Sequence, residues 1–296
     1  MKRGLIIKLR PLEGLEVGTK GLVASGVVGS YKSVFKGRGL EFAGYRQYMP
    51  GDDASLIDWK ASARMREILI KEFEEERNLN VFFLVDASNS MVYSSISKLK
   101  CEYAAELVGS LGFVILHSGD SVGFTLFSDK ILSRSLPFGG QGRHFHLMKE
   151  LSNVNNYGGH YDLVHALKYV GSFLERGSVL IVVSDFIGLK GDWENHLRLA
   201  SQKYDVIGVM VRDPRDKKLP KMGMGNVLLE DPYSGEQIVV DTEAVAPQYK
   251  RHVAQQERKL KEIFLQSNAD FLSLSTDEDF VGPLFRFFKE RRSRLR

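Results

Sequence analysis

Apolar and polar residues follow two different periods from residue 79 onward, one of strand type and one of helix type. The run 80–86, NVFFLVD, is continuous and apolar up to its final acid. Such a run is typical of a central parallel strand that is buried on both faces. Further strands are predicted at residues 121–127, 130–136, 178–185, 205–211 and 269–275, the second of them as the hairpin partner of the first. Helices are predicted at residues 98–117, 161–175, 193–202 and 243–266.

The alternation of strands and helices predicts an α/β fold with a doubly wound, mainly parallel sheet and right-handed crossovers. Residues 213–241 contain two alternating runs around PYSG, which predicts a β-hairpin insertion before the helix at 243–266. Residues 1–78 are instead glycine-rich and then aromatic and charged, and alternation such as that at 15–27 indicates short strands. We therefore predict a small N-terminal β-rich appendage at 1–78 and an α/β domain at 79–296.

Composition and charge restrict the class of protein. The 296 residues, of which 43% are hydrophobic and 26% charged, are typical of a folded globular protein with one large domain and a smaller unit. The formal charge of +4 is small and the two signs are interleaved, so we expect no nucleic-acid partner. The single cysteine, Cys101, fits a reducing compartment. No stretch has the length of a signal-peptide core or a membrane span, so we expect a cytoplasmic location without a transmembrane segment.

Two acidic residues end predicted central strands, Asp86 and Asp185. Open α/β sheets bind ligands beyond the carboxyl ends of their strands, where strand order reverses. Ser88 and Ser90 follow Asp86 at intervals of two, so one carboxylate and two hydroxyls can point at one centre. Hard oxygen donors of this kind suit Mg²⁺ or Mn²⁺. The alternative is that both serines cap the helix that follows.

The Asp86, Ser88 and Ser90 pattern resembles the metal-ion-dependent adhesion site of von Willebrand factor A domains. Other segments resemble bacterial domain-of-unknown-function family 58, whose members carry such a domain: GLEF, YRQYMPGDD, IDWKASAR, KEFEEER, GGHYDL, DPRD and DPYSGE, in this order. The resemblance implies a von Willebrand factor A-like, Rossmann-like fold and a metal site formed by Asp86, Ser88, Ser90 and Asp185, with Asp162 as a further ligand. It also implies partnership with AAA+ ATPases of the MoxR type, which are thought to act as chaperones that assemble complexes.

The chain departs from this family at one expected ligand. Members usually have Gly-Gly-Thr-Asp-Leu, and here Tyr161 replaces the threonine when Asp162 is aligned. A phenol reaches further from the backbone than a threonine hydroxyl, so the loop must move, or Asp162 or a water must substitute.

The leading hypothesis is accordingly a protein–protein interaction module, not an enzyme, in which a partner's carboxylate completes the coordination of the metal. Two alternatives stay open: a scaffold that needs no metal, and a metal-dependent hydrolase. The hydrolase is weakened because no evident general base accompanies Asp86 and Asp185.

Two further segments allow two interpretations each. The charged and aromatic stretch from Arg46 to Arg64 is interpreted as a structural collar that ties the appendage to the domain, with a binding surface as the alternative. The C-terminal segment FVGPLFRFFKERRSRLR is expected to pack a helix on the domain through its aromatic side chains. Its basic residues would alternatively contact an anionic membrane or an acidic partner.

Overall fold

The computed structural model describes residues 41–74, 78–219 and 226–294. These residues contain a six-stranded sheet with the strand order β10-β7-β6-β3-β4-β5. Its strands are β3 (Asn80–Asp86), β4 (Ser121–Phe127), β5 (Ile131–Phe138), β6 (Val179–Ser184), β7 (Asp205–Arg212) and β10 (Asp270–Ser275). Neighbouring strands are parallel, except that β5 is antiparallel to β4. The predicted mainly parallel sheet, with its one hairpin, is confirmed.

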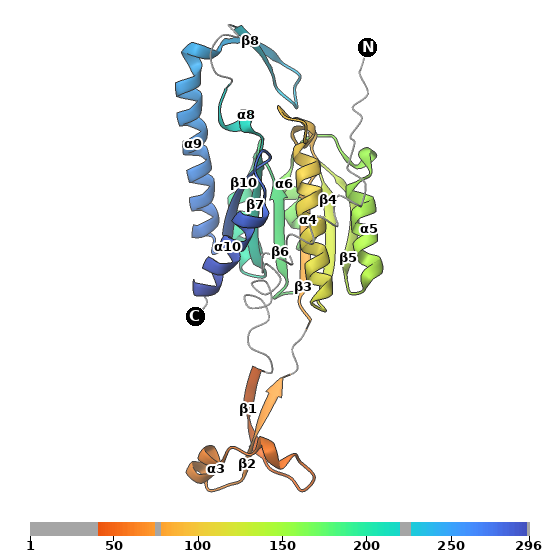
Figure 1. Ribbon diagram of the computed structural model, residues 1–296, viewed down its shortest axis with the longest axis vertical. Coiled ribbons are helices and arrows are strands. Elements are labelled where there is room, and N and C mark those ends of the chain that lie inside the picture. The colour runs from red at the N-terminus through yellow and green to blue at the C-terminus, as the bar shows by residue number, and fades with distance from the viewer. Residues whose placement is uncertain (1–40, 75–77, 220–225, 295–296) are drawn as a thin grey trace.

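Helices cover both faces of this sheet (Figure 1). One face carries α4 (Lys100–His117), α5 (Gln141–Leu151) and α10 (Val281–Arg294), and the other carries α6 (Leu163–Val170), α7 (Trp193–Ser201) and α9 (Thr242–Gln266). Successive residues of β3 point to opposite faces: Phe83 joins the first layer, whereas Phe82 and Leu84 join the second. Both faces are therefore buried, which explains why the strand is apolar at every position and confirms the doubly wound α/β fold.

The C-terminal helix α10 packs on the sheet through its aromatic side. Phe287 and Phe288 are buried in the first layer. Arg291 is buried as well, and its guanidinium pairs with Asp205 of β7 and Asp270 of β10. The packing alternative for this segment is therefore confirmed, and one of its arginines belongs to the domain's own structure.

A β-hairpin lies beyond the carboxyl end of the sheet (Figure 1). It consists of β8 (Asn226–Glu230) and β9 (Gln237–Asp241), which are antiparallel. The helix α9 begins directly after it, because the Asp241 carboxylate accepts hydrogen bonds from the first N–H groups of the helix. The predicted insertion is confirmed. A short helix, α8 (Pro214–Lys217), precedes it and was not predicted, since four residues are too few to show a hydrophobic period.

An antiparallel ribbon lies at the opposite end of the sheet from the hairpin (Figure 1). It is formed by β1 (Glu41–Gln47) and β2 (Leu69–Glu74), which enclose a short helix, α3 (Trp59–Met65).

The charges of the ribbon are paired locally, and the interpretation of this stretch as a collar that ties it to the domain stays a prediction. Arg46 pairs with Asp52 at 2.7 Å and Lys71 with Asp58 at 3.4 Å, so these ion pairs join residues of the ribbon to one another. The strands expected around residues 15–27 lie outside the described residues, and the domain boundary at residue 78 stays a prediction.

Candidate functional site

The two predicted acids lie on adjacent strands where the order of the sheet reverses. Asp86 is the last residue of β3, and Asp185 directly follows β6. The two strands are parallel neighbours, with β4 and β5 continuing on one side and β7 and β10 on the other. Both side chains are fully buried. The topology therefore places both carboxylates at the position where open α/β sheets bind ligands.

The two serines after β3 face this position. The Oγ atoms of Ser88 and Ser90 lie 3.3 Å apart, and both residues are buried. Ser88 occupies the N-cap position of a 3₁₀ turn, Asn89–Val92, but its side chain makes no capping bond there. The hydroxyls thus belong to a buried polar group together with Asp86, whose Oδ1 accepts a hydrogen bond from the Ser88 N–H at 2.8 Å.

Asp86 has an unusual electrostatic environment. Its Oδ2 accepts a hydrogen bond from the Ser184 hydroxyl at 2.7 Å. Burial, and then the neighbouring Asp185 carboxylate, raise the pKa of Asp86 to about 7, against the smaller opposing effect of the hydrogen bonds from Ser184 and Ser88. A cation placed beside this carboxylate would relieve the cost of burying its charge.

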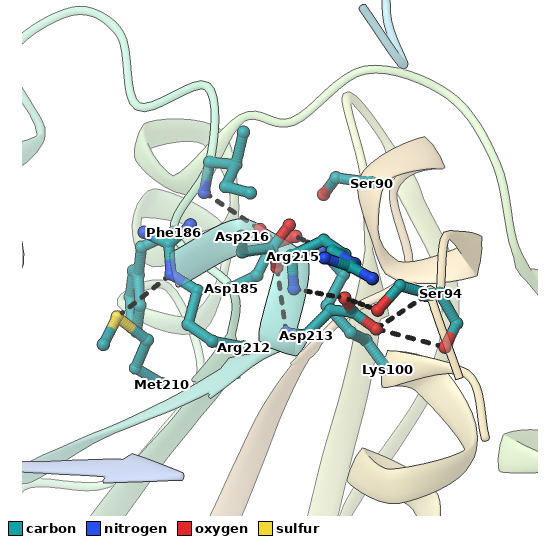
Figure 2. A network of polar contacts seen from close by, with 12 residues as sticks. Ser90, Ser94, Lys100, Asp185, Phe186, Met210, Arg212, Asp213, Arg215 and Asp216 are labelled. Carbon is teal, nitrogen blue, oxygen red and sulfur yellow. Dashed lines mark hydrogen bonds and ion pairs between the residues drawn. The ribbon is translucent and has the colours of Figure 1, made fainter. Parts of the chain in front are cut away.

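A lysine neutralises the second acid. Lys100, the first residue of α4, is buried, and its Nζ lies 2.7 Å from Asp185 Oδ2 and 3.0 Å from Asp216 Oδ2 (Figure 2). The other oxygen of Asp185 accepts the Ile187 N–H at 2.9 Å. Burial acts to lower the pKa of Lys100, but the two carboxylates outweigh it and raise the pKa, so the lysine remains charged. Asp185 is therefore already paired with a cation of the protein itself.

The sequence carries a signal for Lys100 in the helical pattern of α4. On α4, Lys100 is followed at helical intervals by Ala104, Val108 and Leu111, all of which are buried. A lysine on the apolar face of a helix requires a partner, because an unpaired buried charge is strongly unfavourable. The identity of that partner depended on the tertiary structure.

The DPRD segment after β7 supports this lysine (Figure 2). Asp213 is buried and accepts hydrogen bonds from the Ser95 N–H at 2.8 Å and the Arg215 N–H at 2.7 Å. Burial acts to raise the pKa of Asp213, yet the bonds from Ser95 and Arg215 hold it below its ordinary value. Asp216 in turn accepts the Asp213 N–H at 3.0 Å. The segment joins β7 to the loop before α4 and presents Asp216 to the lysine.

The loop before α6 places its two predicted residues differently. Tyr161, at the threonine position, is buried, and burial followed by the nearby Asp86 carboxylate raises its pKa well above the ordinary value. Asp162 is exposed, and its Oδ1 accepts the His165 N–H at 2.9 Å as the N-cap of α6. Within the described residues, no three acidic, histidine or cysteine side chains form a group that could hold a metal. The structure thus brings Tyr161 to the buried group and assigns Asp162 to a helix cap.

One further tyrosine reaches the site from the hairpin. The Tyr233 hydroxyl lies 3.0 Å from Ser90 Oγ, 3.2 Å from Ser88 Oγ and 3.1 Å from the Ile187 carbonyl oxygen. The sequence predicts the hairpin but not this contact, because a residue in a PYSG turn is ordinarily exposed to solvent.

The sequence matches a known protein family over most of its length. The family described as "Protein of unknown function DUF58" matches residues 44–259, more than half of the 296 residues. The chain belongs to the DUF58 family. An uncharacterized protein of Mycobacterium tuberculosis strain H37Rv is 25% identical to this DUF58 chain over 285 residues, which cover 95% of the chain and 89% of the relative. The uncharacterized protein YeaD of Bacillus subtilis is 41% identical over 54 residues, 18% of the chain and 14% of the relative.

Solved structures share the fold of this DUF58 protein. An aerotolerance-related membrane protein from Bacteroides fragilis is similar with a TM-score of 0.50 and 18% identity, over 73% of the chain and all of that protein. A von Willebrand factor type A protein from Catenulispora acidiphila is similar with a TM-score of 0.40 and 10% identity, over 76% of the chain and 43% of that protein. The predicted resemblance to the family is confirmed, and the α/β fold is shared with the Bacteroides fragilis protein.

The predicted cytoplasmic location is contradicted by the comparisons. The Bacteroides fragilis protein that shares the fold is described as a membrane protein. Among the helices within residues 41–74, 78–219 and 226–294, none has the length and apolar character that a bilayer crossing requires. The cytoplasmic location was expected because the apolar stretches are short. The length of apolar stretches bears only on membrane-spanning helices and does not test other ways of associating with a membrane.

The residues of the site fit a divalent cation in chemical type. The Asp86 carboxylate and the Ser88 and Ser90 hydroxyls are hard oxygen donors within one buried polar group. The neighbours that donate to Asp86 in the described structure are neutral, so a cation would find an uncompensated charge there. Asp185 offers less negative charge to a cation, because Lys100 already donates a hydrogen bond to one of its oxygens.

Proposed function

We propose that this DUF58 protein is a protein–protein interaction module that binds its partner at the carboxyl end of the sheet. The observation that carries the proposal is the pair of serine hydroxyls, Ser88 and Ser90, buried 3.3 Å apart beside Asp86 at the reversal of strand order. Buried polar side chains that are not needed for helix capping mark this edge as a binding position.

We further propose that Mg²⁺ or Mn²⁺ binds there, held by Asp86, Ser88 and Ser90 with support from Asp185. The ion would supply a positive charge, and a carboxylate of the partner could complete its coordination shell. The protein's own residues hold the donors in place: Ser184 and the Ser88 N–H orient Asp86. Since Lys100 reduces the negative charge available from Asp185, we expect the affinity for the ion to be moderate.

The proposed partner is an AAA+ ATPase of the MoxR type, and the proposed role is chaperone-like assembly of complexes. This part rests on the family resemblance alone. The chemistry at the site adds one requirement, namely that the partner present an acidic residue on an exposed segment that can reach the sheet edge.

A pull-down from the native extract tests the proposal. Wild-type protein is compared with Asp86→Ala, each with and without EDTA, and Asp162→Ala serves as the matched control because its carboxylate caps a helix and is exposed. We expect an ATPase to be recovered by the wild type and the control but lost with EDTA or Asp86→Ala. Recovery that is insensitive to both would refute a metal-dependent interaction at this site.

A metal-independent scaffold is the second candidate, and the ion pair between Lys100 and Asp185 favours it. A lysine ammonium already provides one positive charge at the sheet edge. Calorimetry with Mg²⁺ and Mn²⁺ separates the two candidates, because heat of binding that is absent from both wild type and Asp86→Ala would leave only the scaffold.

A further inference from the structure

The tip of the β8–β9 hairpin enters the candidate site rather than solvent. A phenol hydroxyl has one proton and two acceptor positions, so it can make three hydrogen bonds. The Tyr233 oxygen lies within hydrogen-bond distance of three oxygens, those of Ser88, Ser90 and the Ile187 carbonyl, and its single proton can be donated to only one of Ser90 and Ile187 at a time. Its oxygen thus faces the same two serine oxygens that an external ligand would use.

The protein provides a shaped pocket for this ring. Gly188 has φ +86°, and a Cβ at this residue would lie 3.0 Å from a ring carbon of Tyr233. The His160 ring stacks against the Tyr233 ring, with their centroids 5.9 Å apart. The backbone at the tip is held as well, because Asn89 Nδ2 donates to the Pro232 carbonyl at 3.1 Å. The loops that carry the site residues therefore also form the pocket that holds the Tyr233 ring.

The rest of the hairpin is attached much less firmly than its tip. Leu228, Ile238 and Val239 are exposed by 56%, 60% and 68%, so its apolar side chains are not part of the core. A cavity of about 440 Å³ lies beneath it, lined by Lys100 and Asp216 among others. The hairpin thus spans a hollow and contacts the domain through Pro232 and Tyr233 at its tip and through Glu230, which accepts a hydrogen bond from Tyr93 at 3.4 Å.

We propose that Tyr233 is an internal ligand of the site, which the hairpin must withdraw before a cation and the carboxylate of a partner can bind. This inference rests on the proposed function and adds its regulation. Mg²⁺ binds oxygen at about 2.1 Å, and an ion bound to both serine oxygens would use the lone pairs that now take part in their hydrogen bonds with the phenol and with each other. The structure is the closed state, and an occupant of the site competes with Tyr233.

Competition predicts a specific change in affinity. Tyr233→Phe keeps the ring in its pocket but removes the hydroxyl, and with it the hydrogen bonds that an incoming ion must break. Because only the wild type must break these bonds, we expect Mn²⁺ to bind about tenfold more tightly to Tyr233→Phe than to the wild type. Tyr93→Phe is the matched control, since this tyrosine contacts Glu230 of the hairpin at 3.4 Å rather than the serines.

The experiment combines two measurements on the full chain. Calorimetric titration with Mn²⁺ gives the affinities, and hydrogen exchange without metal reports the loops at residues 87–89 and 158–159 and the hairpin at 226–241. In Tyr233→Ala, which removes the anchor, we expect exchange in these segments to be about tenfold faster than in Tyr93→Phe. Equal Mn²⁺ affinity in the wild type and Tyr233→Phe would overturn the proposal. If no variant binds Mn²⁺, the proposed cation fails by itself and exchange decides: faster exchange in Tyr233→Ala supports the closure, and unchanged exchange overturns it.

Discussion

Replacing Lys100 with methionine isolates the energetic role of the buried lysine. The ammonium lies 2.7 Å from Asp185 Oδ2, and the side chains are 2% and 0% exposed, so solvent cannot replace the lost charge. After the substitution, Asp185 keeps the hydrogen bond from the Ile187 N–H to its other oxygen. Methionine fills a similar volume, and Asp216, whose side chain is 20% exposed, can be rehydrated. The cost is therefore that of one stranded buried carboxylate, about 3–5 kcal/mol.

Urea unfolding at about pH 7, followed by circular dichroism, measures this cost as a lower midpoint with an unchanged slope. Lys98→Met is the control, because Lys98 pairs with Glu106 at 2.7 Å while both side chains are about a quarter exposed. We expect it to cost less than about 1 kcal/mol. The double variant Lys100→Met with Asp185→Asn should recover most of the loss. A Lys100→Met protein within about 1 kcal/mol of the wild type would show that the reasoning is incorrect.

Three further perturbations test other parts of the structure. The pKa of Asp86 is raised from 3.8 to about 7, so stability is greatest below the lower value and falls as pH rises through about 7. In metal-free buffer, the free energy of unfolding of the wild type should therefore fall by up to about 4 kcal/mol between pH 3.8 and about pH 7, and Asp86→Asn should lack this fall. An identical dependence of the free energy of unfolding on pH in the two proteins would contradict this. A Cβ at Gly208 would lie 2.3 Å from the Phe264 ring of α9. Gly208→Ala should therefore destabilise the protein by about 1–3 kcal/mol and lower the melting temperature. An unchanged melting temperature would show that α9 moves away at little cost. Arg291→Leu removes a buried guanidinium that pairs with Asp205, whose side chain is 39% exposed, and with Asp270, which Arg294 still binds. It should therefore cost only about 1 kcal/mol, seen as faster hydrogen exchange over residues 281–294, and unaltered protection there would refute it.

Local patterns were sufficient to predict the sheet and the position of its two acids. The apolar run of β3 is continuous because helices cover both faces, and this burial leaves a direct mark on the composition of the strand. Asp86 and Asp185 were identified because each ends such a run. Because ligands bind where strand order reverses, the two acids were predicted to share one site without knowledge of the strand order.

The occupants of the site were not predictable in the same way. Asp162 matched the family motif, yet its carboxylate caps α6, since an N-cap position offers unsatisfied N–H groups within immediate reach. Tyr161 fills the threonine position with a buried ring, and whether a phenol can replace the threonine hydroxyl there stays a prediction. Both outcomes depend on local backbone conformation, which a motif alone does not specify.

The sequence by itself determined the strands of the six-stranded sheet, most of the helices that cover it and which end of the sheet holds the carboxylates, because periodicity reports burial within one element. Only the tertiary structure decided what surrounds those carboxylates. Lys100 meets Asp216 across 116 positions, and Tyr233 meets Ser88 across 145. Neither contact is visible in the hydrophobic pattern of the sequence, because each depends on how a loop or hairpin folds back over the sheet. In the folded protein, that arrangement pairs one buried charge or hydroxyl with another.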